Sequence, residues 1–176
     1  MATSVTYDTN GVFTGPDAVA GSLINDGSII TMVNQAAVTV NSPTNISLGD
    51  VIVTPPASGT AMFAGDTLTL TILESNPTLG NGLTQAMNVT GTITSVSDTL
   101  DLKFAPTTIV IGNETYQLAS DYLLVAPNTN AGSTSIQASL VSRVGATIPE
   151  PSIAGMFLTG MLGCLGGFWF TRKRKV

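Results

Sequence analysis

Hydrophobic and polar residues alternate along most of the chain before residue 142. In residues 67–72, TLTLTI, every second residue is leucine or isoleucine and the others are threonines. The alternation recurs in residues 88–94, 99–104 and 135–140. A period of two indicates half-buried β-strands, because successive side chains of a strand point to opposite faces of the sheet. The predicted core positions in these strands are Leu68, Leu70, Ile72, Val89, Ile93, Leu100, Leu102, Phe104, Ile136, Ala138 and Leu140.

Turn-forming residues separate these runs. The clearest turns are predicted at residues 14–17 (TGPD), 42–45 (SPTN), 54–59 (TPPASG), 75–82 (SNPTLGNG) and 126–132 (APNTNAG). Residues 107–118 predict a β-hairpin, in which Gly112 and Asn113 supply the positive φ angles of a tight turn. The inward residues of this hairpin are predicted to be Ile109, Ile111, Tyr116 and Leu118.

The spacing of strands and turns predicts the fold class. Turns recur about every 8–12 residues, as in a sandwich or barrel, and no apolar stripe of helical period precedes residue 150. We predict an all-β body built as an antiparallel two-sheet sandwich of about eight to ten strands. The strand order stays open, because the pattern does not contain it.

The C-terminal part departs from this pattern. Residues Ile153 to Phe170 carry no charge, and as a helix they would be roughly 27 Å long, close to the thickness of the hydrocarbon core of a bilayer. The competing interpretation is a buried helix of a soluble fold. Five glycines would weaken a helix in water, whereas a bilayer tolerates them better. We therefore predict a single transmembrane helix.

The residues around this helix predict its orientation and the domain boundaries. Arg172, Lys173, Arg174 and Lys175 follow the apolar run and are expected to stay in the cytoplasm, which places the body outside. The predicted order is an extracellular β-sandwich at 1–145, a Pro-Glu-Pro linker at 146–152, the transmembrane helix at 153–170 and a basic tail at 171–176.

Charge and composition exclude several classes of function. Residues 1–150 contain eleven acidic residues and two basic ones, Lys103 and Arg143, a formal charge of −9. So acidic a body cannot neutralise a series of phosphates, which excludes nucleic-acid binding. The chain has no histidine, and its one cysteine is Cys164 in the apolar run. Zinc sites of cysteine and histidine and histidine-based acid–base catalysis are therefore excluded from the body.

The chain end resembles a known sorting signal. Pro149, Glu150 and Pro151 stand directly before the apolar span, and the basic cluster follows at the C-terminus. This order of three parts resembles the PEP-CTERM sorting signal of exported bacterial proteins. The resemblance implies recognition by an exosortase, a membrane-embedded cysteine protease that would cut near the motif. The body would then be released to the cell surface or the extracellular matrix.

Two further expectations follow from the resemblance. Residues 3–142, with SPTNISLGD, IGNETYQL and YLLVAPNTNAGSTSIQASL, resemble a strand-rich domain that recurs in such exported proteins but implies no activity. Exosortase substrates also carry an N-terminal secretion signal. Residues 1–15 have neither its basic region nor its apolar region, so we expect the natural gene to encode a leader upstream of Met1.

Candidate ligand-binding residues are few. Asp50, Asp66, Asp98, Asp101 and Glu114 could bind calcium through oxygen atoms, but no loop has EF-hand spacing and aspartate is common in turns. Turns are therefore the favoured interpretation, and we predict neither a metal nor another cofactor. Stacking on sugars would depend on Tyr7, Tyr116 and Tyr122.

These observations favour a non-enzymatic structural protein of the cell surface or matrix, with the exosortase as its processing partner. The body's own partner is expected to be exopolysaccharide or a second copy of the chain, because its Thr- and Val-rich strands contain few lysines. One alternative is a module that binds or hydrolyses extracellular polysaccharide. Another is a permanently anchored single-pass membrane protein.

Overall fold

The computed structural model describes residues 2–143, and for residues 85–88 it describes the backbone only. The described residues form thirteen β-strands and one 3₁₀ turn, η1 (Asn130–Gly132), and contain no α-helix. The predicted all-β class with two antiparallel sheets is confirmed for this part of the chain. No helix within it is long and apolar enough to cross a membrane. The predicted span Ile153–Phe170 lies outside the described residues.

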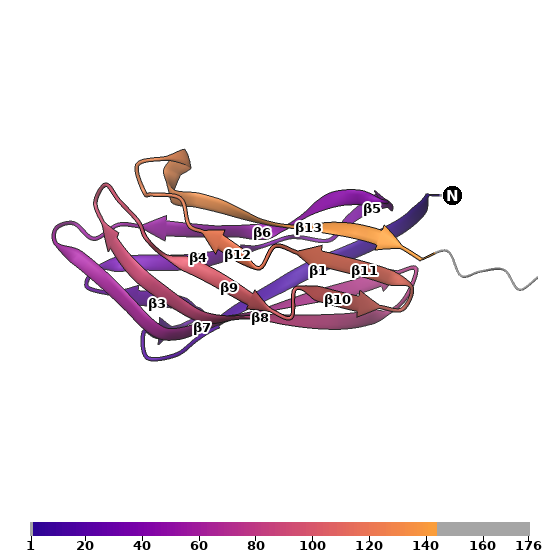
Figure 1. Ribbon diagram of the computed structural model, residues 1–176, viewed down its shortest axis with the longest axis horizontal. Helices are drawn as coiled ribbons and strands as arrows, with labels where there is room; N and C mark the ends of the chain where they lie inside the picture. The colour runs from indigo at the N-terminus through magenta and orange to yellow at the C-terminus, as the bar shows by residue number, and fades with distance from the viewer. Residues whose placement is uncertain (1, 144–176) are drawn as a thin grey trace, which may run out of the picture. The chain divides into compact units, whose positions relative to one another are not determined.

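The strands form two sheets in which all neighbouring strands are antiparallel (Figure 1). The six-stranded sheet has the order β12-β9-β8-β7-β1-β5, from β1 (Thr3–Thr14), β5 (Val38–Ser42), β7 (Thr60–Asn76), β8 (Gly80–Thr94), β9 (Asp101–Ala105) and β12 (Asp121–Leu123). The seven-stranded sheet has the order β10-β11-β13-β6-β4-β3-β2, from β2 (Ala18–Val19), β3 (Ser22–Asn25), β4 (Ser28–Asn34), β6 (Thr44–Thr54), β10 (Thr108–Ile111), β11 (Glu114–Leu118) and β13 (Ser133–Ser142).

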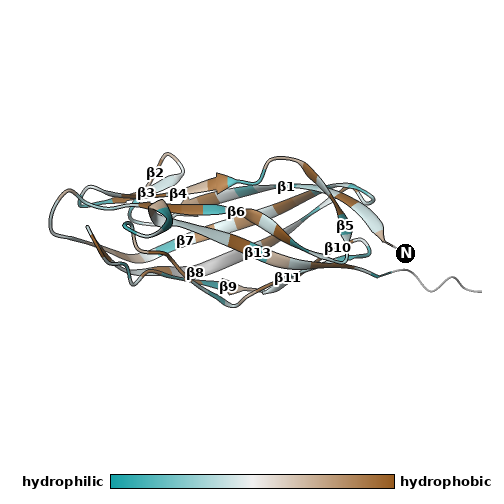
Figure 2. Ribbon diagram, turned by 90° about the horizontal axis from the view of Figure 1, so that it is seen from above, coloured by the Kyte–Doolittle hydropathy of each residue, from teal (hydrophilic) through white to brown (hydrophobic). Residues whose placement is uncertain are grey.

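One hydrophobic core contains residues of both sheets. Hydrophobic and hydrophilic residues alternate along the ribbons in Figure 2, and this alternation is what forms the core. In β7 the residues Leu68, Leu70 and Ile72 are fully buried, as predicted, and the intervening threonines are partly exposed. All the other predicted core positions are buried too, including the inward residues of the hairpin β10–β11. The phase of the alternation therefore identified which face of each strand is buried.

The predicted number of strands, eight to ten, is too low. β2 and β12 contain only two and three residues, so they are too short to show an alternating pattern. The predicted turn at residues 75–82 is also too long, because β7 continues to Asn76 and β8 begins at Gly80. In the hairpin turn, Gly112 has a positive φ of 57° and Asn113 does not, so glycine alone supplies the special conformation.

The strands at the sheet edges are short. β5 and β12 have five and three residues, and β10 and β2 have four and two. β10 also packs closely against β8, where a Cβ added to Gly82 would lie 2.1 Å from Cγ2 of Ile109. Short edges offer a second chain few free backbone groups, which limits pairing between molecules. The longest free edge is β5, whose sequence VTVNS carries no charge.

Candidate functional site

The sorting signal predicted from the sequence lies outside the described residues. This applies to Pro149, Glu150 and Pro151, to the span Ile153–Phe170 and to Arg172, Lys173, Arg174 and Lys175. The structure does describe the point from which this segment continues. β13 ends at Ser142, and the Arg143 backbone N–H donates a hydrogen bond to the Asn113 carbonyl at 2.8 Å. The candidate site within the body is the polar cluster at this end of β13.

Two glutamates are buried here, although the strands around them are apolar. Glu74, on β7, is 2% exposed, and Glu114, on β11, is 1% exposed. The Tyr116 hydroxyl donates a hydrogen bond to Oε2 of Glu74 at 2.6 Å, and the Thr78 backbone N–H donates one to Oε1 at 3.3 Å. Since β7 and β11 belong to different sheets, the Tyr116–Glu74 contact joins the two sheets inside the core.

The second glutamate, Glu114, is hydrogen bonded to the end of the last strand, β13. The Ser142 hydroxyl donates a hydrogen bond to Oε2 of Glu114, and the Ser142 backbone N–H donates one to Oγ of Ser42 at 2.7 Å. Ser42 is the last residue of β5, and Glu114 faces Ser142 across the β11–β13 pair. The end of β13 is therefore held both by its own sheet and by the end of an edge strand of the other sheet.

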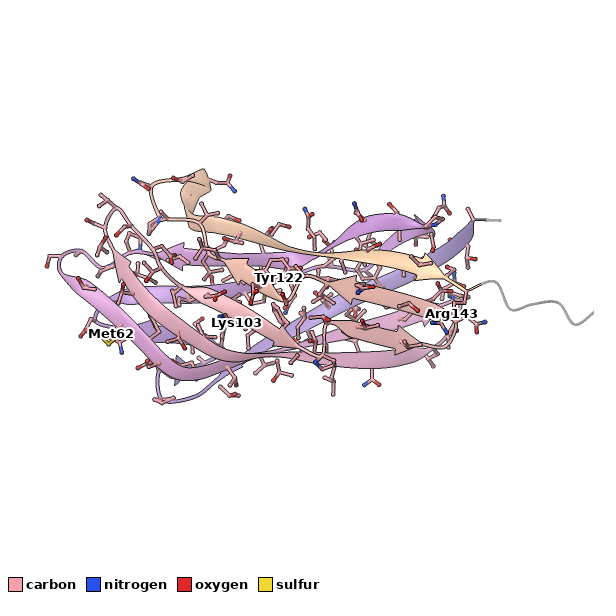
Figure 3. The ribbon with its side chains drawn as sticks, viewed as in Figure 1. Met62, Lys103, Tyr122 and Arg143 are labelled. Atoms are coloured by element: carbon pink, nitrogen blue, oxygen red, sulfur yellow. The ribbon has the colours of Figure 1, made fainter. Side chains whose placement is uncertain are left out.

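Burial has the largest effect on the pKa values in this cluster. Burial raises the pKa of Glu74, and the charge of Glu114 raises it further, while hydrogen bonds from Tyr116 and Thr78 lower it. Burial also raises the pKa of Tyr116, as do its hydrogen bond to Glu74 and the negative charge there. Among the described residues, Nζ of Lys103 and Oδ2 of Asp101 form an ion pair at 3.3 Å. Figure 3 shows Lys103 on β9, apart from Arg143 at the end of β13.

The three tyrosines take structural positions. Tyr7 and Tyr116 are 2% and 0% exposed and pack edge to face, with 6.4 Å between ring centroids. The Tyr7 hydroxyl donates a hydrogen bond to the Ser47 carbonyl at 2.8 Å, and burial raises the pKa of Tyr7 to about 12. Tyr122, on β12, packs edge to face on Phe104, and its hydroxyl donates to the Gln137 carbonyl at 2.5 Å (Figure 3). Tyr7 and Tyr116 therefore present no open ring face to a sugar.

The acidic residues considered for calcium are dispersed. Asp50 lies on β6, Asp66 on β7 and Glu114 on β11, while Asp98 precedes β9 and Asp101 begins it. The described residues hold no group of three or more His, Cys, Asp or Glu side chains that could bind a metal. Oδ1 of Asp98 accepts a hydrogen bond from the Leu100 backbone N–H at 2.5 Å, as in a local turn, and burial raises the pKa of Asp98 to about 6.

Two shallow hollows lie on the six-stranded sheet, and the sequence did not predict them. The first, of about 290 Å³, is lined by Asp8, Leu73, Glu74, Ser75, Leu79, Gly80 and Asn81. The second, of about 250 Å³, is lined by Thr69, Leu83, Thr84, Ala105 and Pro106. Oδ1 of Asp8 is buried without a hydrogen-bond partner, and Leu79 is 87% exposed. The residues that line the two hollows combine apolar, amide and hydroxyl groups with the carboxyls of Asp8 and Glu74.

The chemistry available to the buried cluster is limited. General acid–base catalysis on a polysaccharide needs two carboxylates that reach the substrate across a cleft. Glu74 and Glu114 are instead enclosed and engaged with Tyr116 and Ser142. We interpret the cluster as a set of contacts that holds the two sheets together at the end of the last described strand, β13. Comparison with known proteins finds no matching family model, no matching curated protein and no matching solved structure.

This interpretation predicts the effect of Tyr116→Phe. Removal of the hydroxyl leaves the Glu74 carboxylate with the Thr78 N–H as its remaining donor of those described above. We expect a loss of about 1.5–3 kcal/mol in the free energy of unfolding, as for a hydrogen bond to a charged group. Chemical denaturation followed by circular dichroism measures it.

Tyr7→Phe is the control, because it removes the hydroxyl of a similarly buried tyrosine whose acceptor, the Ser47 carbonyl, is neutral. Its expected cost is about 0.5–1.5 kcal/mol. In a Glu74→Gln background the cost of Tyr116→Phe should fall toward the same range. An equal cost of the two tyrosine changes in the natural background would contradict a special role for the Tyr116–Glu74 contact.

Proposed function

We propose that this protein is an exported structural component of the cell surface or extracellular matrix, released by exosortase cleavage near Pro149-Glu150-Pro151. The observation that carries the proposal is the order of the motif, the uncharged span and the basic tail at the chain end. The last described strand, β13, ends at Ser142, and the motif follows later in the sequence at Pro149. Cleavage at the motif would therefore fall C-terminal to every strand of the described body.

The surface of the body supports a structural role. Hydroxyl groups of neighbouring strands are hydrogen bonded to one another in Thr6–Thr39 and Thr14–Thr67, and Thr92 of β8 is hydrogen bonded to Thr99 of the following loop. At these positions the surface presents hydroxyl groups rather than ions, so it can lie against neutral polysaccharide there without desolvating ions. The enclosed glutamates of the core add no accessible catalytic pair. A passive matrix component needs no more than these features.

The intact mass and the location of the mature native protein test this proposal. Cleavage predicts that protein recovered from the cell surface lacks residues 153–176. Surface protein that still contains these residues would contradict cleavage and favour the alternative of a permanently anchored single-pass protein. The same measurement on the inner-membrane fraction should detect the uncleaved precursor.

A second candidate function is polysaccharide binding, favoured by the two hollows on the six-stranded sheet. Asp8 and Asn81 both line the first hollow, so a carboxyl and an amide are close to any sugar hydroxyls bound there. Binding of the released protein to a glycan array, or hydrolysis of the native exopolysaccharide, would separate this function from a purely structural one. Neither result is expected if the body only fills the matrix.

Self-association would follow from the free edge of β5. We expect weak pairing, because this edge has only five residues. Asn41→Lys adds a charge to an exposed position of that edge and should abolish any concentration-dependent increase in sedimentation coefficient. Ser139→Lys, at an exposed position of the central strand β13, is the matched control and should have no such effect. A monomer at every concentration would contradict self-association.

A further inference from the structure

A second pair of acidic side chains lies where β1 turns into β2. Asp66 is fully buried on β7, and the turn at residues 14–17 covers it. The Asp17 backbone N–H donates a hydrogen bond to Oδ1 of Asp66 at 3.0 Å. A Cβ added to Gly15 would lie only 2.3 Å from that same Oδ1, so the turn can approach this closely only with glycine. The approach brings together residues that are 49 positions apart in the sequence.

The other oxygen of Asp66 has no partner. Oδ2 is buried and accepts no hydrogen bond from any described residue. The pairing of β7 with β8 shifts register on both sides of Asp66, a local irregularity that redirects a side chain. Burial raises the pKa of Asp66, and the negative charge of Asp17 raises it further, while the hydrogen bond from the Asp17 N–H lowers it. A fully buried carboxylate beside a second carboxylate requires a positive partner or a proton.

The described residues offer no basic side chain as a partner for the carboxyls of Asp17 and Asp66. Of the two basic residues in the described part, Lys103 pairs with Asp101 and Arg143 lies at the end of β13. Asn25 lies beside the pair, where its Nδ2 donates a hydrogen bond to Oδ1 of Asp17 at 2.9 Å. Oδ2 of Asp17 and Oδ2 of Asp66 are therefore the carboxylate oxygens that remain available to a cation. We propose that Asp17 and Asp66 bind a calcium ion.

The chemistry of the donors selects calcium. Both carboxylates are hard oxygen donors, and this part of the chain contains no cysteine or histidine, which zinc would prefer. Calcium accepts irregular sets of six to eight oxygens, and because Asp17 is partly exposed, water can complete the shell. A site with two carboxylates is weakly charged, so its dissociation constant should be about 10⁻⁴–10⁻³ M, as in extracellular modules. The ion would hold the β1–β2 turn onto β7.

Thermal unfolding of the full-length chain in detergent tests this site. With 5 mM CaCl₂ in place of EDTA at pH 7, the midpoint of unfolding should rise by about 3–8 °C. Asp66→Asn keeps the acceptor for the Asp17 N–H and should abolish this rise, and Asp17→Asn should do the same if the first variant does not fold. Asp26→Asn, at an exposed turn residue with positive φ, is the control and should respond to calcium as the natural chain does.

Three outcomes would overturn the proposal. A natural chain that does not respond to calcium would mean that a proton separates Asp17 from Asp66. A response that survives both Asp17→Asn and Asp66→Asn would place the calcium elsewhere. An equal rise with 5 mM MgCl₂ would contradict the assignment to calcium, since magnesium requires a more regular octahedral shell. All three are independent of the sorting proposal, because none depends on cleavage or export.

Discussion

Glu150→Ala is expected to retain the full-length chain in the inner membrane and to remove the released body from the cell surface. The predicted cleavage signal contains a single charged residue between two prolines, so the protease loses its one ionic recognition group. The amount of released protein should fall by about ten-fold or more, since each 1.4 kcal/mol of lost recognition corresponds to about a factor of ten. Immunoblots of membrane and surface fractions, with intact mass measurement, record the result.

Thr147→Ala is the control for this change, because residue 147 precedes the motif by two positions and carries no charge. It should be released as the natural chain is. Release of Glu150→Ala at the natural level, with the same mass, would contradict recognition of the motif. Retention of both variants would show that the linker as a whole, rather than Glu150, is what the protease requires.

Acidification from pH 7 to pH 5 is expected to stabilise the folded body by about 2 kcal/mol in EDTA. Burial raises the pKa of Asp66, Glu74 and Asp98, that of Asp98 from 3.8 to about 6. A group whose pKa is raised by folding binds more protons in the folded state, within the window between its unfolded and folded pKa values. The free energy of unfolding therefore falls as the pH rises through that window, and it increases again on acidification.

Asp98 alone shows the scale of this effect. Its pKa window runs from about 4 to about 6, and each pKa unit corresponds to about 1.4 kcal/mol, but its side chain is only partly buried. Between pH 7 and pH 5 only the upper unit of this window is crossed, so after allowance for solvent screening its share is about 1 kcal/mol. Asp98→Asn should flatten the pH profile by that amount, and Asp26→Asn at an exposed turn should leave it unchanged. A free energy of unfolding that is constant or lower at pH 5 would contradict the burial of these three carboxyls.

Local pattern was sufficient to predict which residues face the core. The alternation in residues 67–72 placed Leu68, Leu70 and Ile72 correctly, because a strand's two faces are set by the chain itself. The hairpin at Gly112 was predictable for the same reason, since a two-residue turn joins adjacent strands. Very short strands such as β2 were not predicted, because two residues cannot show a period.

The pairing of strands could not be predicted from the pattern. β1 lies between β5 and β7, and β13 lies between β11 and β6, although these partners are far apart in the sequence. Alternation specifies the face of a strand but not its neighbour, because many strands of this chain present similar Thr and Val sequences. The packing of the two sheets around one core decides among the possible pairings.

The two acidic clusters show the same division between sequence and structure. Glu74 is in phase with Leu68, Leu70 and Ile72, so the sequence by itself already placed a carboxyl at an inward position. Only the tertiary structure supplied its donor, Tyr116, which reaches it from the opposite sheet 42 residues later. Asp66 is in the same phase, although the register of β7 against β8 shifts on both sides of it. Its meeting with the Asp17 turn, 49 residues away, depends on how two strands pack at one end of the sandwich, because long-range contacts of polar atoms are set by packing geometry and not by local periodicity.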